Sequence, residues 1–124
     1  MRASTSAMPR KKIDFDTVRE IARGLVDVEE STAYGSPALK VRGQLLAAIA
    51  INKSAEPGSL MVRVDFAQRA ELLAAAPDVY YVTDHYVKHP MVLVRLSAID
   101  RNALCDLLER AWRFTSSKKK VRRG

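Results

Sequence analysis

The sequence predicts an α+β fold, a two-layer sandwich in which an antiparallel sheet of about five strands is covered by about three helices. The first indication is the stretch 79–96, where two runs rich in Val and Tyr flank a polar centre, as in a β-hairpin. The second is the alternation of apolar and polar residues in short runs between residues 38 and 64. The third is an apolar stripe at helical spacing near each end of the chain. Strands joined by short turns pair antiparallel, and the helical stripes then cover the sheet.

The first expected element is a helix, which either Asp14 or Asp16 can cap. Apolar residues recur at a spacing of 3.6 over residues 15–25, and Gly24 favours fraying at the end of this helix. The stretch 28–32 is short and ambiguous, and it fits an edge strand.

The next strands are expected after a turn at residues 34–37 (YGSP), where Gly allows positive φ and Pro favours an extended neighbour. Residues 38–42 alternate in polarity, so that Lys40 and Arg42 share one face of a strand. Arg42 and Gly43 then form a plausible hairpin turn.

The run 45–52 (LLAAIAIN) is apolar on both faces, and we interpret it as a covered central strand, with a helix as the competing interpretation. Residues 54–59 indicate a loop, and residues 60–64 alternate as a strand does. A capping box beginning at Asp65 predicts the second helix, at about 66–75.

The stretch 79–96 is expected to form two strands joined by a tight connection at 83–85. Asp100 can cap the last helix, which we expect to end near Thr115. Its apolar stripe is the clearest in the chain and consists of Leu104, Leu107, Leu108, Ala111 and Trp112.

The net charge of +7 is concentrated at the two ends of the chain. Residues 1–12 hold four basic and no acidic residues, and we expect a flexible basic arm there. Residues 116–124 hold five basic residues and form an expected basic tail. The single domain expected at 13–115 is slightly acidic, with 12 basic and 14 acidic residues, so the high isoelectric point is weak support for nucleic-acid binding.

Several classes of protein are disfavoured by composition. The longest apolar run is too short for a membrane span, and no signal peptide is apparent at the start of the sequence. The lone Cys105 fits a reducing compartment, so we expect a cytoplasmic protein. We also expect no cofactor. No nucleophile elbow, phosphate-binding loop or paired-cysteine motif occurs, so we expect no enzyme.

Three blocks of sequence resemble the MmcQ/YjbR family of small bacterial proteins. They are VEESTAYGSPALKVRG at 28–43, LMVRVD at 60–65, and VTDHY at 82–86 followed by Pro90 and VLVRL at 92–96. The resemblance extends from Val18 to Trp112. It implies a two-layer α+β fold similar to the bacterial frataxin CyaY, and DNA binding through a "double wing" of loops.

A metal site is the less favoured interpretation of the H-x-x-x-H spacing of His85 and His89. Pro90 disfavours the helix that would bring both imidazoles to one face, and no third ligand has a convincing spacing. We therefore predict no metal and interpret the two histidines as part of a solvated hairpin.

The leading hypothesis is a DNA-binding protein whose two hairpin tips and basic tails contact phosphates, while an aromatic ring stacks on or beside a base. The candidate residues are Lys40, Arg42, His85, Tyr86, Lys88, His89 and Arg95. The alternative is a non-enzymatic adaptor that binds a protein or small ligand on the exposed sheet face. Its candidate residues are Tyr34, Ser36, Tyr86 and Met91.

Overall fold

The computed structural model describes residues 13–33 and 35–120, with backbone alone for 117–120. These residues form six strands and three helices. The strands are β1 (Val28–Ala33), β2 (Ser36–Val41), β3 (Gln44–Ile49), β4 (Ser59–Arg63), β5 (Tyr80–Tyr81) and β6 (Met91–Arg95). The helices are α2 (Phe15–Ala22), α3 (Phe66–Ala75) and α4 (Arg101–Lys120). The predicted α+β class is confirmed, with six strands where about five were expected.

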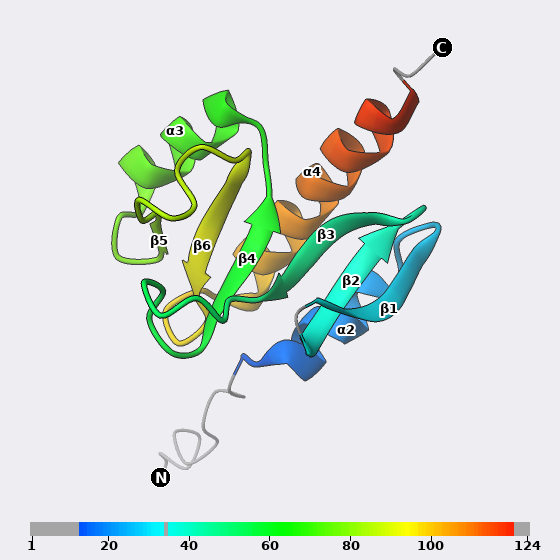
Figure 1. The fold of residues 1–124 in the computed structure, drawn as a ribbon, viewed down its shortest axis with the longest axis horizontal. Coiled ribbons are helices and arrows are strands. Elements are labelled where there is room, and N and C mark those ends of the chain that lie inside the picture. The colour runs from blue at the N-terminus through cyan, green and yellow to red at the C-terminus, as the bar shows by residue number, and fades with distance from the viewer. Residues whose placement is uncertain (1–12, 34, 121–124) are drawn as a thin grey trace, which may run out of the picture.

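The strands form one open antiparallel sheet in the order β1-β2-β3-β4-β6-β5. Helices α2 and α4 lie behind this sheet in Figure 1, and α3 lies at the side where β5 and β6 are. We call the opposite face, which these helices leave uncovered, the open face of the sheet.

The main core lies between the sheet and the helices. Strand β4 illustrates the alternation: Leu60 and Val62 are fully buried in this core, whereas Met61 and Arg63 alternate with them and are only half-buried. The stripe predicted on the last helix is confirmed, because Leu104, Leu107, Leu108 and Ala111 are at most 1% exposed. Burial of these aliphatic side chains is the main stabilising contribution to the fold.

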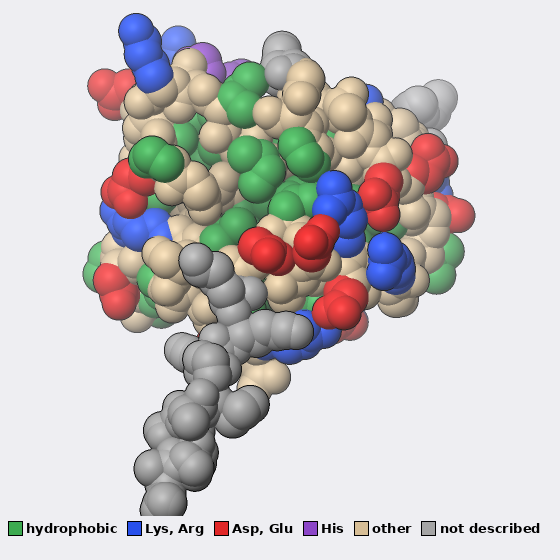
Figure 2. Space-filling model, turned by 90° about the horizontal axis from the view of Figure 1, so that it is seen from below, with side chains coloured by type: hydrophobic (Ala, Val, Ile, Leu, Met, Phe, Trp, Pro, Cys, Tyr) green, Lys and Arg blue, Asp and Glu red, His purple; other side chains and the backbone are tan. Residues whose placement is uncertain are grey.

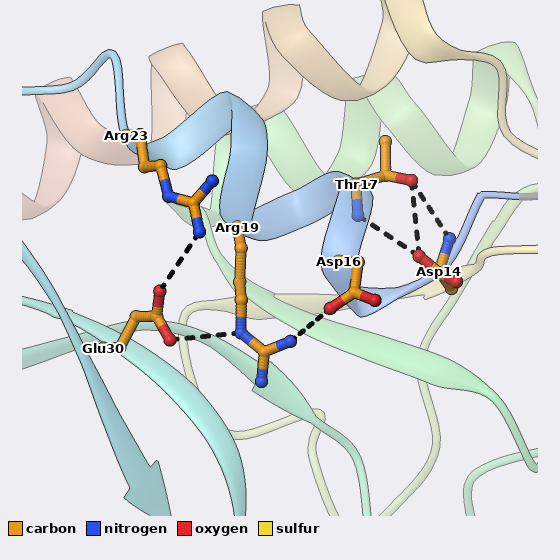
Figure 3. A network of polar contacts seen from close by, with 6 residues as sticks. All are labelled: Asp14, Asp16, Thr17, Arg19, Arg23 and Glu30. Carbon is orange, nitrogen blue, oxygen red and sulfur yellow. Dashed lines mark hydrogen bonds and ion pairs between the residues drawn. The ribbon is translucent and has the colours of Figure 1, made fainter.

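Helix α2 begins at the predicted cap. The carboxylate of Asp14 accepts a hydrogen bond from the backbone N–H of Thr17, and the Thr17 hydroxyl accepts one from the backbone N–H of Asp14 (Figure 3). Arg19 then pairs with Asp16 on the same helix and with Glu30 on β1, the latter at 3.1 Å. These contacts attach α2 to the edge of the sheet, and each exposed pair contributes at most about 1 kcal/mol.

The turn between β2 and β3 is the predicted one. Arg42 and Gly43 have φ angles of 50° and 86°, which is the pattern of a two-residue type I′ hairpin turn. Val41 pairs directly with Gln44 across the turn.

The hairpin formed by β5 and β6 differs from the prediction at its tip. The strands pair as expected, but they are joined by the nine residues 82–90 instead of a tight connection at 83–85. Tyr86 and Val87, expected to be extended, lie in turns because both backbone N–H groups donate to the carbonyl of Thr83 at 2.9 Å. We call residues 82–90 the β5–β6 loop.

The predicted domain bounds, residues 13 and 115, stay predictions. Helix α4 continues to Lys120, beyond the expected end near Thr115 and into the predicted basic tail. The arm at 1–12 and residues 121–124 lie outside the described residues.

None of the helices within the described ranges is long and apolar enough to cross a membrane.

Candidate functional site

The Arg42-Gly43 turn and the β5–β6 loop lie at the same end of the sheet. Because β3 and β4 are antiparallel, Gln44 at the start of β3 lies at the end where β4 finishes. Arg63, the last residue of β4, pairs with Met91, the first of β6, which follows the β5–β6 loop. Two strands separate β2 from β6, so the two tips are about 14 Å apart across the sheet at the usual strand spacing.

Two of the predicted phosphate contacts are engaged by carboxylates. The Arg42 Nε lies 3.0 Å from Asp27 Oδ2. Arg95 forms two hydrogen bonds with Glu56, at 2.8 and 2.9 Å, and its guanidinium lies over the ring of Tyr81 at 4.3 Å. Hydrogen bonding between the two partners lowers the pKa of Glu56 and raises that of Arg95. Arg95 also ends β6, away from the β5–β6 loop. In the structure each of these arginines has a carboxylate as its anionic partner.

The other predicted basic residues are not in ion pairs within the described part of the chain. His85, Lys88 and His89 are exposed on the β5–β6 loop. Lys40 is half-buried in β2, where it lies across from Glu29 of β1. These four side chains remain available for an anionic partner.

Tyr86 is not the exposed stacking platform that the DNA hypothesis required. Its side chain is 8% exposed and packs with Met91 and Leu93. The His85 ring meets it edge-on, with 4.8 Å between centroids. Tyr86 therefore anchors the β5–β6 loop to the open face, because its ring faces are covered by protein.

Arg69 on α3 also holds this loop, although it is not among the residues predicted for the site. Its guanidinium donates hydrogen bonds to the carbonyls of Val87, His89 and Met91, at 3.1, 3.0 and 3.2 Å. The same group lies over the ring of Phe66 at 4.8 Å. No local sequence signal indicates such a role, because the bonded carbonyls lie 18 to 22 residues further along the chain.

A groove with a volume of about 810 Å³ occupies the open face. Its floor is apolar and comes from β3, β4 and β6, while the β5–β6 loop forms one wall. The apolar lining includes Leu45, Ala48, Ile51, Met61 and Met91, and the basic lining consists of Lys53, Arg63, His85 and His89. No Asp or Glu belongs to the described lining.

The groove contains part of the predicted ligand pocket. Met91 and Tyr86 line it as expected. Ser36 is half-buried in β2 and does not belong to the lining. Tyr34 lies outside the described residues, although its neighbour Ala33 reaches the groove.

Arg63 is the most distinctive side chain of the groove. Its Nε donates to the carbonyl of Leu45 at 2.9 Å, and no carboxylate pairs with it among the described residues. Burial lowers its pKa, because water solvates the guanidinium less well there. A half-buried cation without a counter-ion is costly unless an anion completes it.

Metal binding finds no support in the geometry. His85 and His89 occupy turns of the β5–β6 loop, so helical spacing does not apply to them. Within residues 13–33 and 35–120, no group of three or more His, Cys, Asp and Glu side chains could hold a metal ion.

Comparisons with known proteins place this geometry in a family. Uncharacterised proteins of Mycobacterium tuberculosis and Mycobacterium bovis are 40% identical over 50 residues, which cover 40% of this chain and only 39% of each relative's length. The crystal structure of Deinococcus radiodurans protein DR2400, of family domain DUF419, matches with a TM-score of 0.73. The match covers 90% of this chain and 84% of that chain at 21% sequence identity, so the two proteins share a fold. The sequence profile named YjbR matches residues 23–114. Because this match covers most of the chain, the protein belongs to the YjbR family.

Proposed function

We propose that this YjbR-family protein is a non-enzymatic DNA-binding protein that contacts phosphates through the open face and the β5–β6 loop. The observation that carries the proposal is a set of basic side chains around this face that pair with no carboxylate in the described residues. They are Lys40, Lys53, Arg63, His85, Lys88 and His89. Such a set attracts a polyanion and positions its backbone without reading its sequence.

The distribution of acidic residues supports the same surface. On the helix side, several arginines are neutralised by neighbouring carboxylates, in the pairs Arg19–Glu30, Arg101–Glu20, Arg110–Asp106 and Arg113–Glu109. In Figure 2, His and Lys or Arg side chains lie close together at the upper margin with an acidic side chain beside them at the upper left, and acidic and basic side chains are interspersed lower down. The β5–β6 loop contains one acidic residue, Asp84. The basic side chains without a carboxylate partner therefore favour approach of a phosphate backbone to the open face, although Glu29 lies across from Lys40 on the neighbouring strand.

The test compares the salt dependence of DNA affinity for the full chain and two double variants. Lys40→Ala/Lys88→Ala removes two charges from the open face, and Arg110→Ala/Arg113→Ala removes two from α4. Each lost phosphate contact reduces the slope of log affinity against log salt by roughly 0.7–0.9. We expect the first variant to lose affinity and slope and the second to retain both. Equal losses would show that only net charge matters, and absence of binding at low salt would refute the proposal.

A second candidate, small-ligand binding, is favoured by the size of the groove. Its volume of about 810 Å³ lies within the range of roughly 300–1,000 Å³ typical of ligand pockets. Calorimetry with anionic metabolite-like carboxylates would support this candidate if they bound and DNA did not.

A further inference from the structure

We infer that the DNA bound at this face is single-stranded, with unpaired bases in the groove and a neighbouring phosphate paired with Arg63. The inference rests on the proposed function and specifies the form of nucleic acid that this site accepts.

The shape of the site is the first reason. Four of the unpaired basic side chains, those of Lys53, Arg63, His85 and His89, line a concavity on the open face. A duplex is read by a helix or a two-stranded ribbon that enters its major groove, and its own surface is convex. Helices α2 and α4 lie behind the sheet and α3 lies at its side, beside β5 and β6, so none of these three helices crosses the open face (Figure 1). An unpaired strand can instead place its bases in the concavity.

The chemistry of the floor is the second reason. Ala48, Met61 and Met91 line the floor, where Ala48 and Met91 are buried and Met61 is half-buried. A thioether such as that of Met61 makes favourable contacts with a flat aromatic base. The backbone of a duplex offers only sugars and charged phosphates, so these groups would gain nothing from it. Such contacts lack hydrogen-bond readout, and binding should therefore be tolerant of sequence.

The position of the basic groups is the third reason. Arg63 lies at the end of β4, and Lys53 lies beyond the far end of the neighbouring antiparallel strand β3. The six residues of β3 span about 17 Å at the usual rise per residue. A basic group at each end of an apolar floor fits a short strand whose bases contact the floor and whose phosphates reach the ends.

Arg63 is the specific anchor. Its Nε is used by the carbonyl of Leu45, whereas Nη1 and Nη2 have no hydrogen-bond partner among the described residues. A guanidinium donates such N–H groups in pairs to phosphate oxygens, and partial burial strengthens the interaction. An anion at this position would supply the counter-ion that the described residues do not provide.

The experiment measures fluorescence anisotropy of three labelled ligands of equal length with the full chain. They are an oligothymidylate, the corresponding duplex, and an abasic single strand that keeps the phosphates. We expect the oligothymidylate to bind most tightly. Arg63→Gln should weaken its binding roughly ten- to a hundredfold, the loss expected for charged hydrogen bonds. Arg113→Gln makes the same chemical change on α4 and should have no effect.

A second variant tests the floor independently. Ala48→Leu places extra volume in the groove and should weaken binding of the oligothymidylate but not of the abasic strand. Thermal unfolding of both variants identifies any loss of binding that comes from misfolding. Displacement of the oligothymidylate by thymidine monophosphate is then measured on the unmodified protein. Displacement supports the inference.

Several results would overturn it. Duplex or abasic strand binding as tightly as oligothymidylate removes the role of the bases. If duplex binding depends on Lys40 and Lys88 while Arg63→Gln changes nothing, the proposed function stands and the single-strand inference fails. If octanoate binds the groove and no nucleic acid does, both fail in favour of a small carboxylate.

Discussion

Replacing Arg69 by methionine should release the β5–β6 loop while leaving the rest of the fold intact. The guanidinium of Arg69 bonds three carbonyls of the segment that leads into β6, those of Val87, His89 and Met91. Methionine keeps the unbranched stem and the helix propensity of α3 but provides no donor. The change therefore removes the hydrogen bonds, and with them the cation–π contact with Phe66, while the stem of the side chain is kept.

The expected cost follows from the surroundings of each bond. The bonds to Val87 and His89 are exposed, so water can replace the lost donor. The bond to Met91 is half-buried, and a hydrogen bond to a charged group contributes about 1.5–3 kcal/mol. Loss of the cation–π contact with Phe66 adds roughly 0.5–1 kcal/mol. We expect the loop to lose about 2 kcal/mol of local stability.

Native-state hydrogen exchange measures this quantity at individual amides. The N–H groups of Tyr86, Val87 and His89 bond within the loop, and about 2 kcal/mol corresponds to roughly thirtyfold faster exchange. Amides in α4 should be unaffected. Arg69→Lys serves as the control for charge, because a lysine cannot span three carbonyls and should give an intermediate result.

Unchanged exchange in the loop would refute this reasoning, because it would mean that packing of Tyr86 alone holds the loop. Equal acceleration throughout the domain would refute it in another way, by showing that Arg69 supports global stability and not the loop specifically. In the expected case, DNA affinity should also fall, because Lys88 and His89 lose their fixed positions.

Two further predictions concern stability. Gly43→Ala should lower the free energy of unfolding by about 1–2 kcal/mol, because alanine is strained at φ 86°. Gly24→Ala should be neutral or slightly stabilising. Urea titration of both variants measures these free energies, and equal effects of the two substitutions would contradict the prediction. Hydrogen bonding to Arg95 holds the pKa of the Glu56 carboxyl below its usual value in the folded state. The stability contributed by this pair is therefore complete above the unfolded-state pKa of Glu56. It is lost as the pH falls through the folded-state pKa. Urea unfolding of the unmodified protein and Glu56→Gln should therefore differ at neutral pH and converge in acid, and a gap that stays constant would count against the pair.

Features that depend on near neighbours could be predicted from the sequence. The cap at Asp14, the Arg42-Gly43 turn and the stripe of α4 each depend on residues within a few positions of one another. The burial of residues 60–64 follows from strict alternation in the same way. These signals were sufficient for the fold class, because hydrophobic periodicity is the main determinant of secondary structure.

The state of the basic side chains could not be predicted, because it depends on distant partners. The carboxylate that engages Arg95 lies 39 residues away, and that of Arg42 lies 15 residues away. The β5–β6 loop was misread as extended for a related reason. Val and Tyr favour strands locally, but burial of Tyr86 and the bonds from Arg69 outweigh that preference.

The apolar side chains of the groove are the strongest argument that the open face binds something. An antiparallel sheet usually has one packed face and one polar, solvated face. Leu45 and Ile51 nevertheless line the groove, Ile51 is 50% exposed, and neither packs into the two apolar clusters of the domain. They contribute little to folding in these positions, and a polar residue at either would serve a solvated face better. Leu45 lies beside Arg63, which has no counter-ion among the described residues, and this arrangement is explained if a ligand with an apolar part and an anionic part covers both.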